Sequence, residues 1–396
     1  MNTKLQLVTE QSDLNALCSL LTESRYVTVD TEFIRERTYW PQLCLIQLAP
    51  ALSDEFEDIA YLVDPLGGLD LAPVFDLMRD EKVLKIFHAA RQDIEIFVHL
   101  SGDVPTPIFD TQIAAMVCGF GDQVGYETLV KKILRTGLDK SSRFTDWARR
   151  PLSEKQLRYA AGDVTHLRVI YEALAKKLAD SGREAWLTSE MEILENKSTY
   201  VVEPDEAWKR IKTRSNDPRF LGVVRALAAW REREAQRRDA PRGRILKDDA
   251  ILEISAAKPS TREQLTQLRS IQREGRKPEI AEQIVAMVAA GLEAPTEPAP
   301  KKAPPKRPRP GGPALAELLR VLLKAKADKL GVAQRLIANS ADIDALANDP
   351  DAEPPMLKGW RREAFGEDAL RLIAGEIALS AGKSGVKIVE APANGA

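Results

Sequence analysis

The chain has 396 residues, 44% of them hydrophobic and 29% charged, which is the composition of a globular protein with room for two or three domains. Its 57 Lys and Arg residues nearly balance 59 Asp and Glu residues, so the net charge of −2 neither indicates nor excludes a nucleic-acid partner. Three cysteines are too few for a disulfide framework or a zinc site, and no apolar run reaches the length of a membrane span. The first residues lack the features of a signal peptide, so we expect a cytoplasmic protein with reduced thiols.

The first half of the sequence predicts strands followed by helices. Strand patterns cover residues 4–8, 26–33, 43–48, 61–64 and 83–87, and helical patterns cover residues 11–21, 71–78 and 89–100. From residue 111 to about residue 197 the apolar period is helical throughout. This order of elements favours an α/β fold in which helices cover one mixed sheet.

The predicted strand over residues 26–33, YVTVDTEF, carries two carboxylates on one face. Asp30 and Glu32 are two residues apart, so both side chains project from the same side of the strand. Like charges side by side destabilise a sheet unless a positive group lies between them, and Mg²⁺ and Mn²⁺ prefer such hard oxygen ligands. A divalent cation is one explanation of the pair, and a polar, solvent-facing strand edge is the other.

Two further acids lie in predicted helices. Asp93 follows a strand directly, near the start of the helix over residues 89–100, where α/β proteins place functional groups. An acid favoured by the helix dipole is the alternative. Asp163 falls in the middle of a long amphipathic helix over residues 153–178, where Asp has poor propensity, and Tyr159 lies four residues earlier on the same face. An acid and a phenol on a packed face need a partner such as a metal or a bound water.

The second half predicts further units. Glu203-Pro204-Asp205 ends the helical run, and amphipathic helices follow over residues 221–230, 250–254, 262–268 and 280–288. Basic residues outnumber acidic ones between Lys209 and Lys247, which indicates either a phosphate-binding patch or a solvated helix face. Residues 294–313 are rich in Pro, Lys and Arg and predict an extended linker, after which helical patterns resume.

These motifs resemble a known family. DTE at residues 30–32, Asp93 in HAARQDIE, and Tyr159 four residues before Asp163 in YAAGD resemble the three exonuclease motifs of the DEDD superfamily in its tyrosine form. The histidine form has His five residues before the last Asp, where this chain has Arg158. The segments DTEFIRERTYWPQLCLIQLA and LDKSSRFTDWARRPLSEKQLRYAAGDVTHL resemble the ribonuclease D family over residues 5 to about 195.

Two later segments resemble helical nucleic-acid-binding modules. AAWREREAQRRDAPRGRILKDDAILEI is similar to the HRDC domain, and LKGWRREAFGEDALRLIAGEIAL is similar to a second, degenerate HRDC-like bundle. The resemblance implies an α/β fold with a ribonuclease-H-like mixed-sheet exonuclease domain followed by all-α HRDC-type bundles. We therefore expect an exonuclease domain over residues 1–200, an HRDC domain over 205–292, a Pro- and Lys-rich linker over 293–313 and a second HRDC-like domain over 314–396.

The resemblance also implies a chemistry, which is two-metal-ion hydrolysis with Mg²⁺ or Mn²⁺. It makes Asp30, Glu32, Asp93 and Asp163 metal ligands and Tyr159 the residue that orients the attacking water. The implied activity is a 3′–5′ exoribonuclease that trims precursor tRNA and other small structured RNAs and releases nucleoside 5′-monophosphates. The alternatives are a DNA 3′–5′ exonuclease and a catalytically silent RNA-binding protein.

RNA is the expected partner, and we expect no membrane association, no protein partner and a monomer. The helical units should add RNA affinity, on the assumption that they cover no apolar surface of the exonuclease domain; the last unit could pack back on that domain or stay apart from it. Phe33 is a candidate for stacking on a terminal base or for packing in the core. Basic residues before the long helix are candidates for phosphate contacts or for a solvated loop: Lys140, Arg143 and Arg149. We interpret the three histidines as structural: His88, His99 and His166.

Overall fold

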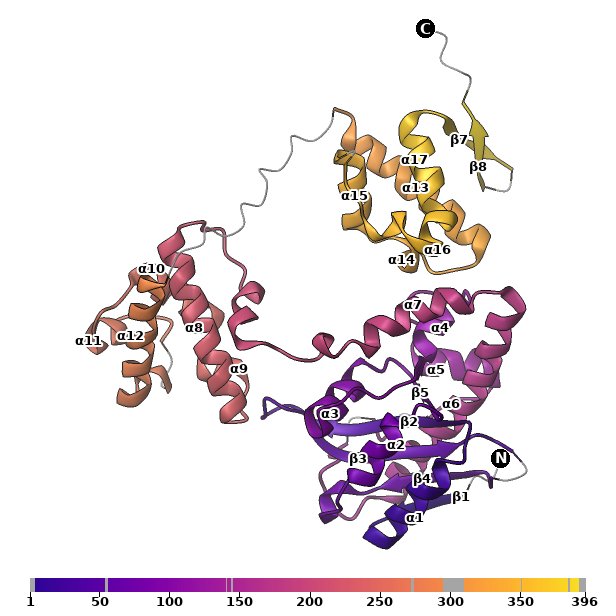
Figure 1. The fold of residues 1–396 in the computed structure, drawn as a ribbon, viewed down its shortest axis with the longest axis horizontal. Coiled ribbons are helices and arrows are strands. Elements are labelled where there is room, and N and C mark those ends of the chain that lie inside the picture. The colour runs from indigo at the N-terminus through magenta and orange to yellow at the C-terminus, as the bar shows by residue number, and fades with distance from the viewer. Residues whose placement is uncertain are drawn as a thin grey trace.

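A computed structural model describes residues 4–53, 56–139, 141–143, 145–271, 274–294, 310–349, 351–383 and 385–391. Most of the linker expected over residues 293–313, its basic cluster at 301–309, and Lys140 lie outside these described residues. Figure 1 shows a sheet-containing domain, a helical bundle joined to it by an extended segment, and a second bundle next to helices α7 and α4. Within the described residues, no helix is long and apolar enough to cross a membrane.

The N-terminal domain is built on one mixed sheet, as the sequence predicts, and this sheet has six strands. The strand order is β1-β4-β3-β2-β5-β6; β3 runs antiparallel to both of its neighbours, and the other adjacent strands are parallel. The strands are β1 (Lys4–Val8), β2 (Tyr26–Ile34), β3 (Gln42–Pro50), β4 (Ile59–Val63), β5 (Leu84–Phe87) and β6 (Ile108–Asp110). Sequence analysis missed β6, because a strand of three residues is too short to show an alternating pattern.

The helices of this domain pack around the sheet, and the longest of them, α6, contacts β2, β3 and β4. They are α1 (Gln11–Leu21), α2 (Ala72–Arg79), α3 (Arg91–Ser101), α4 (Thr111–Val117), α5 (Tyr126–Leu129), α6 (Glu154–Ser181) and α7 (Glu184–Glu195), with a 3-10 turn η1 (Pro65–Gly67) and a π-helical turn η2 (Val130–Leu134). The expectation of helix throughout residues 111–197 was wrong. Gly119 and Gly121 adopt positive φ angles of 81° and 120° after α4, and the chain is irregular again before α6.

The start and orientation of α6 are determined locally. The Ser153 hydroxyl accepts from the Gln156 backbone N–H, and the Gln156 side chain accepts in return from the Ser153 N–H, which together form a capping box. On the sheet, the Thr28 hydroxyl donates to the Val164 carbonyl of α6 at 2.9 Å. Because side chains alternate along a strand, Asp30 and Glu32 leave β2 on the same face as Thr28, under α6.

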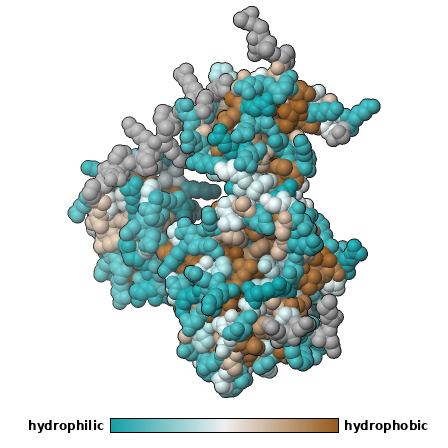
Figure 2. All heavy atoms as spheres, turned by 45° about the vertical axis from the view of Figure 1, so that its right-hand side comes forward, coloured by the Kyte–Doolittle hydropathy of each residue, from teal (hydrophilic) through white to brown (hydrophobic). Residues whose placement is uncertain are grey.

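Two helical units follow. The first contains η3 (Lys197–Thr199), η4 (Pro204–Arg210), α8 (Pro218–Arg237), α9 (Arg242–Ile245), α10 (Asp248–Ala257), α11 (Arg262–Thr266), η5 (Glu274–Arg276) and α12 (Pro278–Glu293). The second contains α13 (Gly312–Leu330), α14 (Gln334–Ile337), α15 (Ser340–Asn348), η6 (Pro355–Leu357), α16 (Gly359–Arg361), η7 (Arg362–Gly366), α17 (Glu367–Ala374), β7 (Ile377–Gly382) and β8 (Gly385–Glu390). The antiparallel hairpin β7–β8 was not expected, since sequence analysis took this unit as helical only. Figure 2 shows hydrophilic side chains over most of the visible surface, with hydrophobic ones gathered mainly on the N-terminal domain and on part of the last bundle.

The first helical unit packs against the loop that follows β2. Tyr39, 4% exposed, lies in the hydrophobic core of that unit, and its hydroxyl hydrogen-bonds with the Glu232 carboxylate. The Arg242 guanidinium lies 4.6 Å from the centre of the Tyr39 ring. The backbone N–H groups of Tyr39 and Trp40 both donate to Asp239, at 3.0 and 2.9 Å. The first helical unit therefore contacts the nuclease domain through a buried aromatic side chain and several hydrogen bonds.

The second helical unit packs against α7 and the end of α4. The Trp186 and Trp360 rings stack with centroids 4.3 Å apart, and Ala333 and Leu336 belong to the same buried cluster as the nuclease core. The Ala333 N–H donates to the Met116 carbonyl at 3.1 Å. The assumption that the helical units cover no apolar surface of the nuclease domain is therefore wrong, and the last unit packs back on that domain. Contacts between residues so distant in the chain leave no periodic pattern in the sequence.

Candidate active site

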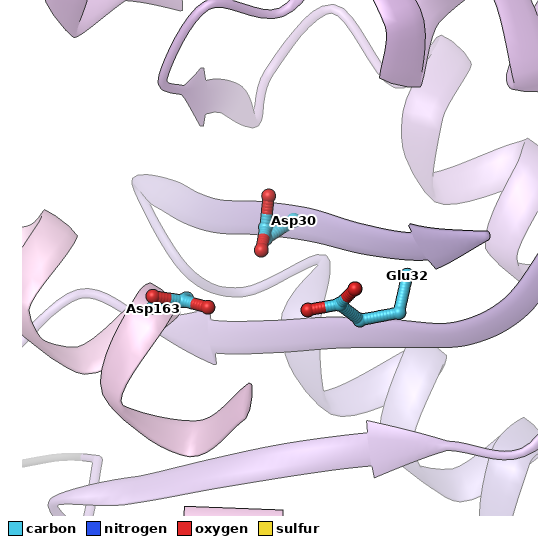
Figure 3. Close-up of side chains that lie close together, drawn as sticks. All are labelled: Asp30, Glu32 and Asp163. Atoms are coloured by element: carbon cyan, nitrogen blue, oxygen red, sulfur yellow. The ribbon is translucent and has the colours of Figure 1, made fainter. Parts of the chain in front are cut away.

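Three carboxylates meet between β2 and α6. Single oxygens of Asp30, Glu32 and Asp163 all lie within 4.8 Å of one another, close enough to share a cation. Figure 3 shows the three side chains converging from the strand and the helix. They line a cavity of about 600 Å³. The spacing of the acids along β2 and the docking of α6 on Thr28 together produce this arrangement.

Asp93 lies on the wall of the same cavity, outside this group of three. It is the third residue of α3, and its Oδ1 accepts from the Thr31 hydroxyl at 2.5 Å. Thr31 leaves β2 on the opposite face from Asp30 and Glu32, so the hydrogen bond connects α3 to the acidic strand. The structure therefore brings all four predicted acids to one cavity.

Burial raises the pKa of each of the four acids, and the charges of neighbouring carboxylates raise those of Asp30 and Glu32 further. Burial, followed by the charges of Asp163 and Asp93, raises the pKa of Glu32 to about 9. Burial raises the pKa of Asp163 and of Asp93 to about 7. The pKa of Asp30 is also raised well above its usual value, first by burial and then by the neighbouring carboxylates. Ionising such a group of acids is unfavourable unless a cation lies among them.

The donor set fits a divalent metal. Carboxylate oxygens are the hard ligands that Mg²⁺ and Mn²⁺ prefer, and the raised pKa values indicate that the described protein groups offset the charge of these acids only in part. A cation would favour the ionised forms and restore ordinary acidity.

Tyr159 lies beside the acids on α6. Its hydroxyl hydrogen-bonds to the Asp163 carboxylate, which lowers the pKa of that acid, while burial and then the Asp163 charge raise the pKa of the phenol above its usual value. The phenol is therefore neutral at physiological pH and keeps a proton to donate. The positive charge of Arg143, which also lines the cavity, lowers the pKa of Glu32 and of Asp163.

Sequence analysis did not single out Asp110, which hydrogen-bonds to the backbone of two cavity-lining residues, Ala89 and Gln112. Its carboxylate accepts from the backbone N–H groups of Ala89 and Ala90 before α3, at 3.1 and 2.9 Å, and from that of Gln112 in α4, at 2.7 Å. Ala89 adopts a φ of 57°, which is unusual for a residue with a side chain and explains why α3 starts later than predicted. An Asp between a strand and a helix is an N-cap signal that could have identified it.

The remaining residues named in the sequence analysis lie partly in the cavity and partly outside it. Phe33 lines the cavity and also packs against the nuclease core. His88 lines the cavity with its Nδ1 3.0 Å from the Thr111 hydroxyl, whereas His99 stacks on Trp40 with centroids 4.0 Å apart. The remaining two are absent from the cavity lining within the described residues: Arg149 and His166.

The fold and the acidic cavity are those of a 3′–5′ exonuclease. The 3′–5′ exonuclease family model matches residues 5–179, and the HRDC domain model matches residues 220–288. The chain belongs to the ribonuclease D family. It is 53% identical over 384 residues to Ribonuclease D of Jannaschia sp. (strain CCS1), covering 97% of this chain and 99% of that protein.

Two further relatives agree. Ribonuclease D of Granulibacter bethesdensis is 47% identical, covering 97% of this chain and 96% of that protein. The crystal structure of Escherichia coli RNase D, described as an exoribonuclease involved in structured RNA processing, matches with a TM-score of 0.79 and 29% sequence identity, covering 94% of this chain and 99% of that one. The chain is therefore a hydrolase that acts on RNA as a 3′–5′ exoribonuclease, and its superfamily implies divalent metal ions.

Proposed function

We propose that this exoribonuclease trims the 3′ ends of precursor tRNA and other small structured RNAs and releases nucleoside 5′-monophosphates. The observation that carries the catalytic part is the convergence of Asp30, Glu32 and Asp163 in one cavity with Tyr159. The substrate class is supported by the E. coli relative, an exoribonuclease involved in structured RNA processing. We also propose that the enzyme is a cytoplasmic monomer with nuclease residues 1–200, an HRDC unit 205–292 and a second HRDC-like unit 314–396.

The four acids are proposed to hold two Mg²⁺ or Mn²⁺ ions. Asp30, Glu32 and Asp163 would hold the first, and Asp30 together with Asp93 the second. When bound, such ions supply an activated water and stabilise charge on the leaving oxygen of the phosphodiester. Asp93 is kept in place by the Thr31 hydroxyl, and Asp163 by the docking of α6 on the sheet.

Tyr159 is proposed to position the attacking water. Its neutral hydroxyl can accept one hydrogen bond and donate another, so it can orient a water without taking up its proton. The phenol is proposed to donate to the neighbouring Asp163, which leaves its oxygen able to accept from the water. Arg143 lies exposed on the cavity wall, where a guanidinium can contact a backbone phosphate of the incoming strand.

The HRDC unit is proposed to add RNA affinity, but through fewer cations than the sequence suggested. Five of its arginines form ion pairs inside the chain: Arg231 with Asp248, Arg233 with Asp205, Arg237 and Arg238 with Glu234, and Arg242 with Glu232. Arg244 is exposed and makes no ion pair within the described part of the chain. We therefore assign phosphate contacts to Arg244 and to the basic residues of the linker, in preference to the five paired arginines.

One assay tests the function. RNA and DNA oligonucleotides of the same sequence, labelled at the 5′ or the 3′ end, are incubated with Mg²⁺, with Mn²⁺ and with a chelator. We expect stepwise shortening of 5′-labelled RNA and immediate release of label from 3′-labelled RNA, only when metal is present. Equal rates of hydrolysis on DNA and RNA would favour the DNA-exonuclease alternative. If neither RNA nor DNA is cleaved when metal is present, the alternative of a catalytically silent RNA-binding protein would be supported.

A further inference from the structure

β3 carries a buried polar side chain directly opposite Asp30. Gln47 is the partner of Asp30 in the antiparallel register of β2 and β3. Side chains in such a pair leave the sheet on the same face, with β-carbons about 4.5–5.5 Å apart. The Gln47 side chain therefore lies under α6 beside the acidic cluster, and the residue is 0% exposed.

The amide of Gln47 has no partner. Neither its Oε1 nor its Nε2 forms a hydrogen bond within the described part of the chain. Buried amides are nearly always paired, because an unpaired one loses its hydrogen bonds to water without replacement. Leucine or methionine would fill the same volume without this penalty, so packing alone does not account for a glutamine here.

The surroundings of Gln47 leave few candidates for a partner. Leu45 and Ala49 flank it on the same face of β3, Leu62 is opposite it on β4, and all three are fully buried. From α6, Ala160, Ala161 and Val164 are buried in the same clusters, and Leu157 and Tyr159 pack against them. Trp147 belongs to the same cluster and has an unpartnered indole N–H, which can donate to the Gln47 Oε1 but cannot accept from its Nε2. The hydroxyl proton of nearby Thr28 is directed to backbone carbonyls, so Thr28 offers the amide only an acceptor oxygen. Asp30 is the polar side chain in register with the amide.

We propose that Gln47 is a positioning residue for Asp30, whose carboxylate accepts a hydrogen bond from the Gln47 Nε2–H₂ group when the site holds a cation. The register of β2 and β3, the burial of the amide and its lack of another partner point to this bond. It would fix the side-chain rotamer of the acid proposed to serve both ions. The inference rests on the proposed function, because it takes Asp30 to be a metal ligand.

Two variants remove the donor and keep the volume, Gln47→Leu and Gln47→Met. Loss of a hydrogen-bond partner of a metal ligand typically lowers metal affinity or activity about 10–100-fold. We expect each variant to bind Mn²⁺ that much more weakly by titration calorimetry without RNA, and to need more metal for half-maximal hydrolysis. The metal-free variants should melt at the wild-type temperature or above it, because the unpaired amide is gone.

Gln156→Leu is the matched control. Gln156 is also buried, at 8% exposed, but its side chain is hydrogen-bonded to Ser153 and Thr145 in the cap of α6. Its loss should lower the melting temperature and leave the affinity for Mn²⁺ unchanged. The Gln47 variants should change the affinity for Mn²⁺ and not lower the melting temperature, whereas Gln156→Leu should do the reverse. This contrast distinguishes a residue that positions a metal ligand from one that supports the fold.

The proposal is wrong if Gln47→Leu and Gln47→Met bind Mn²⁺ with wild-type affinity, whatever their stability. Asp30→Asn separates this failure from failure of the proposed function. If Asp30→Asn keeps near-wild-type hydrolysis, Asp30 is not a metal ligand and both fail. If Asp30→Asn is inactive while the Gln47 variants behave as wild type, only the role of Gln47 fails.

Discussion

Neutralising one acid of the cluster should abolish hydrolysis and stabilise the metal-free protein. Burial raises the pKa of Asp163 from its ordinary 3.8 to about 7, and each tenfold change in proton affinity corresponds to about 1.4 kcal/mol. Near pH 7 the folded state therefore loses about 2–4 kcal/mol by keeping this acid in the cluster. For a domain of about 200 residues, about 1 kcal/mol shifts the melting temperature by about 2–4 °C. Metal-free Asp163→Asn should thus melt about 5–10 °C above the wild type.

The assay is thermal unfolding at pH 7 with a chelator and with Mg²⁺, together with the rate of hydrolysis of a labelled RNA. Wild type should gain stability on adding Mg²⁺, because binding to the folded state alone is stabilising, whereas Asp163→Asn should gain little. Asp64→Asn is the control, since Asp64 is a buried acid paired with Arg150 at 2.6 Å. It should lower the melting temperature by leaving a partly buried guanidinium unpaired. An Asp163→Asn enzyme with wild-type rates, or a metal-free variant that melts below wild type, would refute the reasoning.

Three further outcomes follow from the same site. Tyr159→Phe should lower the turnover rate about 10²-fold or more while the Kd for RNA stays within about twofold, and unchanged turnover would make Tyr159 a packing residue. The metal-free wild type should lose stability as pH rises from about 4 through about 7, because acids whose pKa is raised in the folded state favour folding only while protonated; a flat profile would contradict this. A chain ending at residue 200 should still hydrolyse short RNA, since the cavity lining ends at Leu167, but it should melt earlier because Trp186 and Tyr39 lose their partners. If that truncated chain folds and is inactive on short RNA, the helical units must help to build the active site.

Asp30, Glu32 and Asp163 could be predicted as site residues from the sequence because the spacing that pairs each of them with a neighbouring site residue is local. Asp30 and Glu32 share a strand face through a period of two, and Tyr159 and Asp163 share a helix face through a spacing of four. That these two faces meet depends on the docking of α6 on β2, which no local pattern specifies. The resemblance to a family, rather than periodicity, connected the acids before the structure did.

The unpredicted features depend on contacts between distant residues. Asp110 supports the starts of two helices at once, which a sequence pattern suggests for only one of them. Tyr39 lies 193 residues from Glu232 in the chain, so its burial in the first helical unit could not be read from neighbouring residues. The arginines of α8 look like a phosphate-binding patch in sequence, but the fold pairs Arg231, Arg233 and Arg237 with carboxylates.

The two helical units are attached to the nuclease domain at separate places, one through Tyr39 and the other through Trp186. The peptide between residues 294 and 310 is therefore not required to hold them to the molecule. A chain cleaved by a protease within this stretch should elute as a single particle made of two fragments. The same reasoning makes the stretch a suitable split point, so that fragments produced separately should reassemble and regain the melting temperature of the intact chain. Fragments that separate on gel filtration would show that the contact at Trp186 is too weak to hold the last bundle alone.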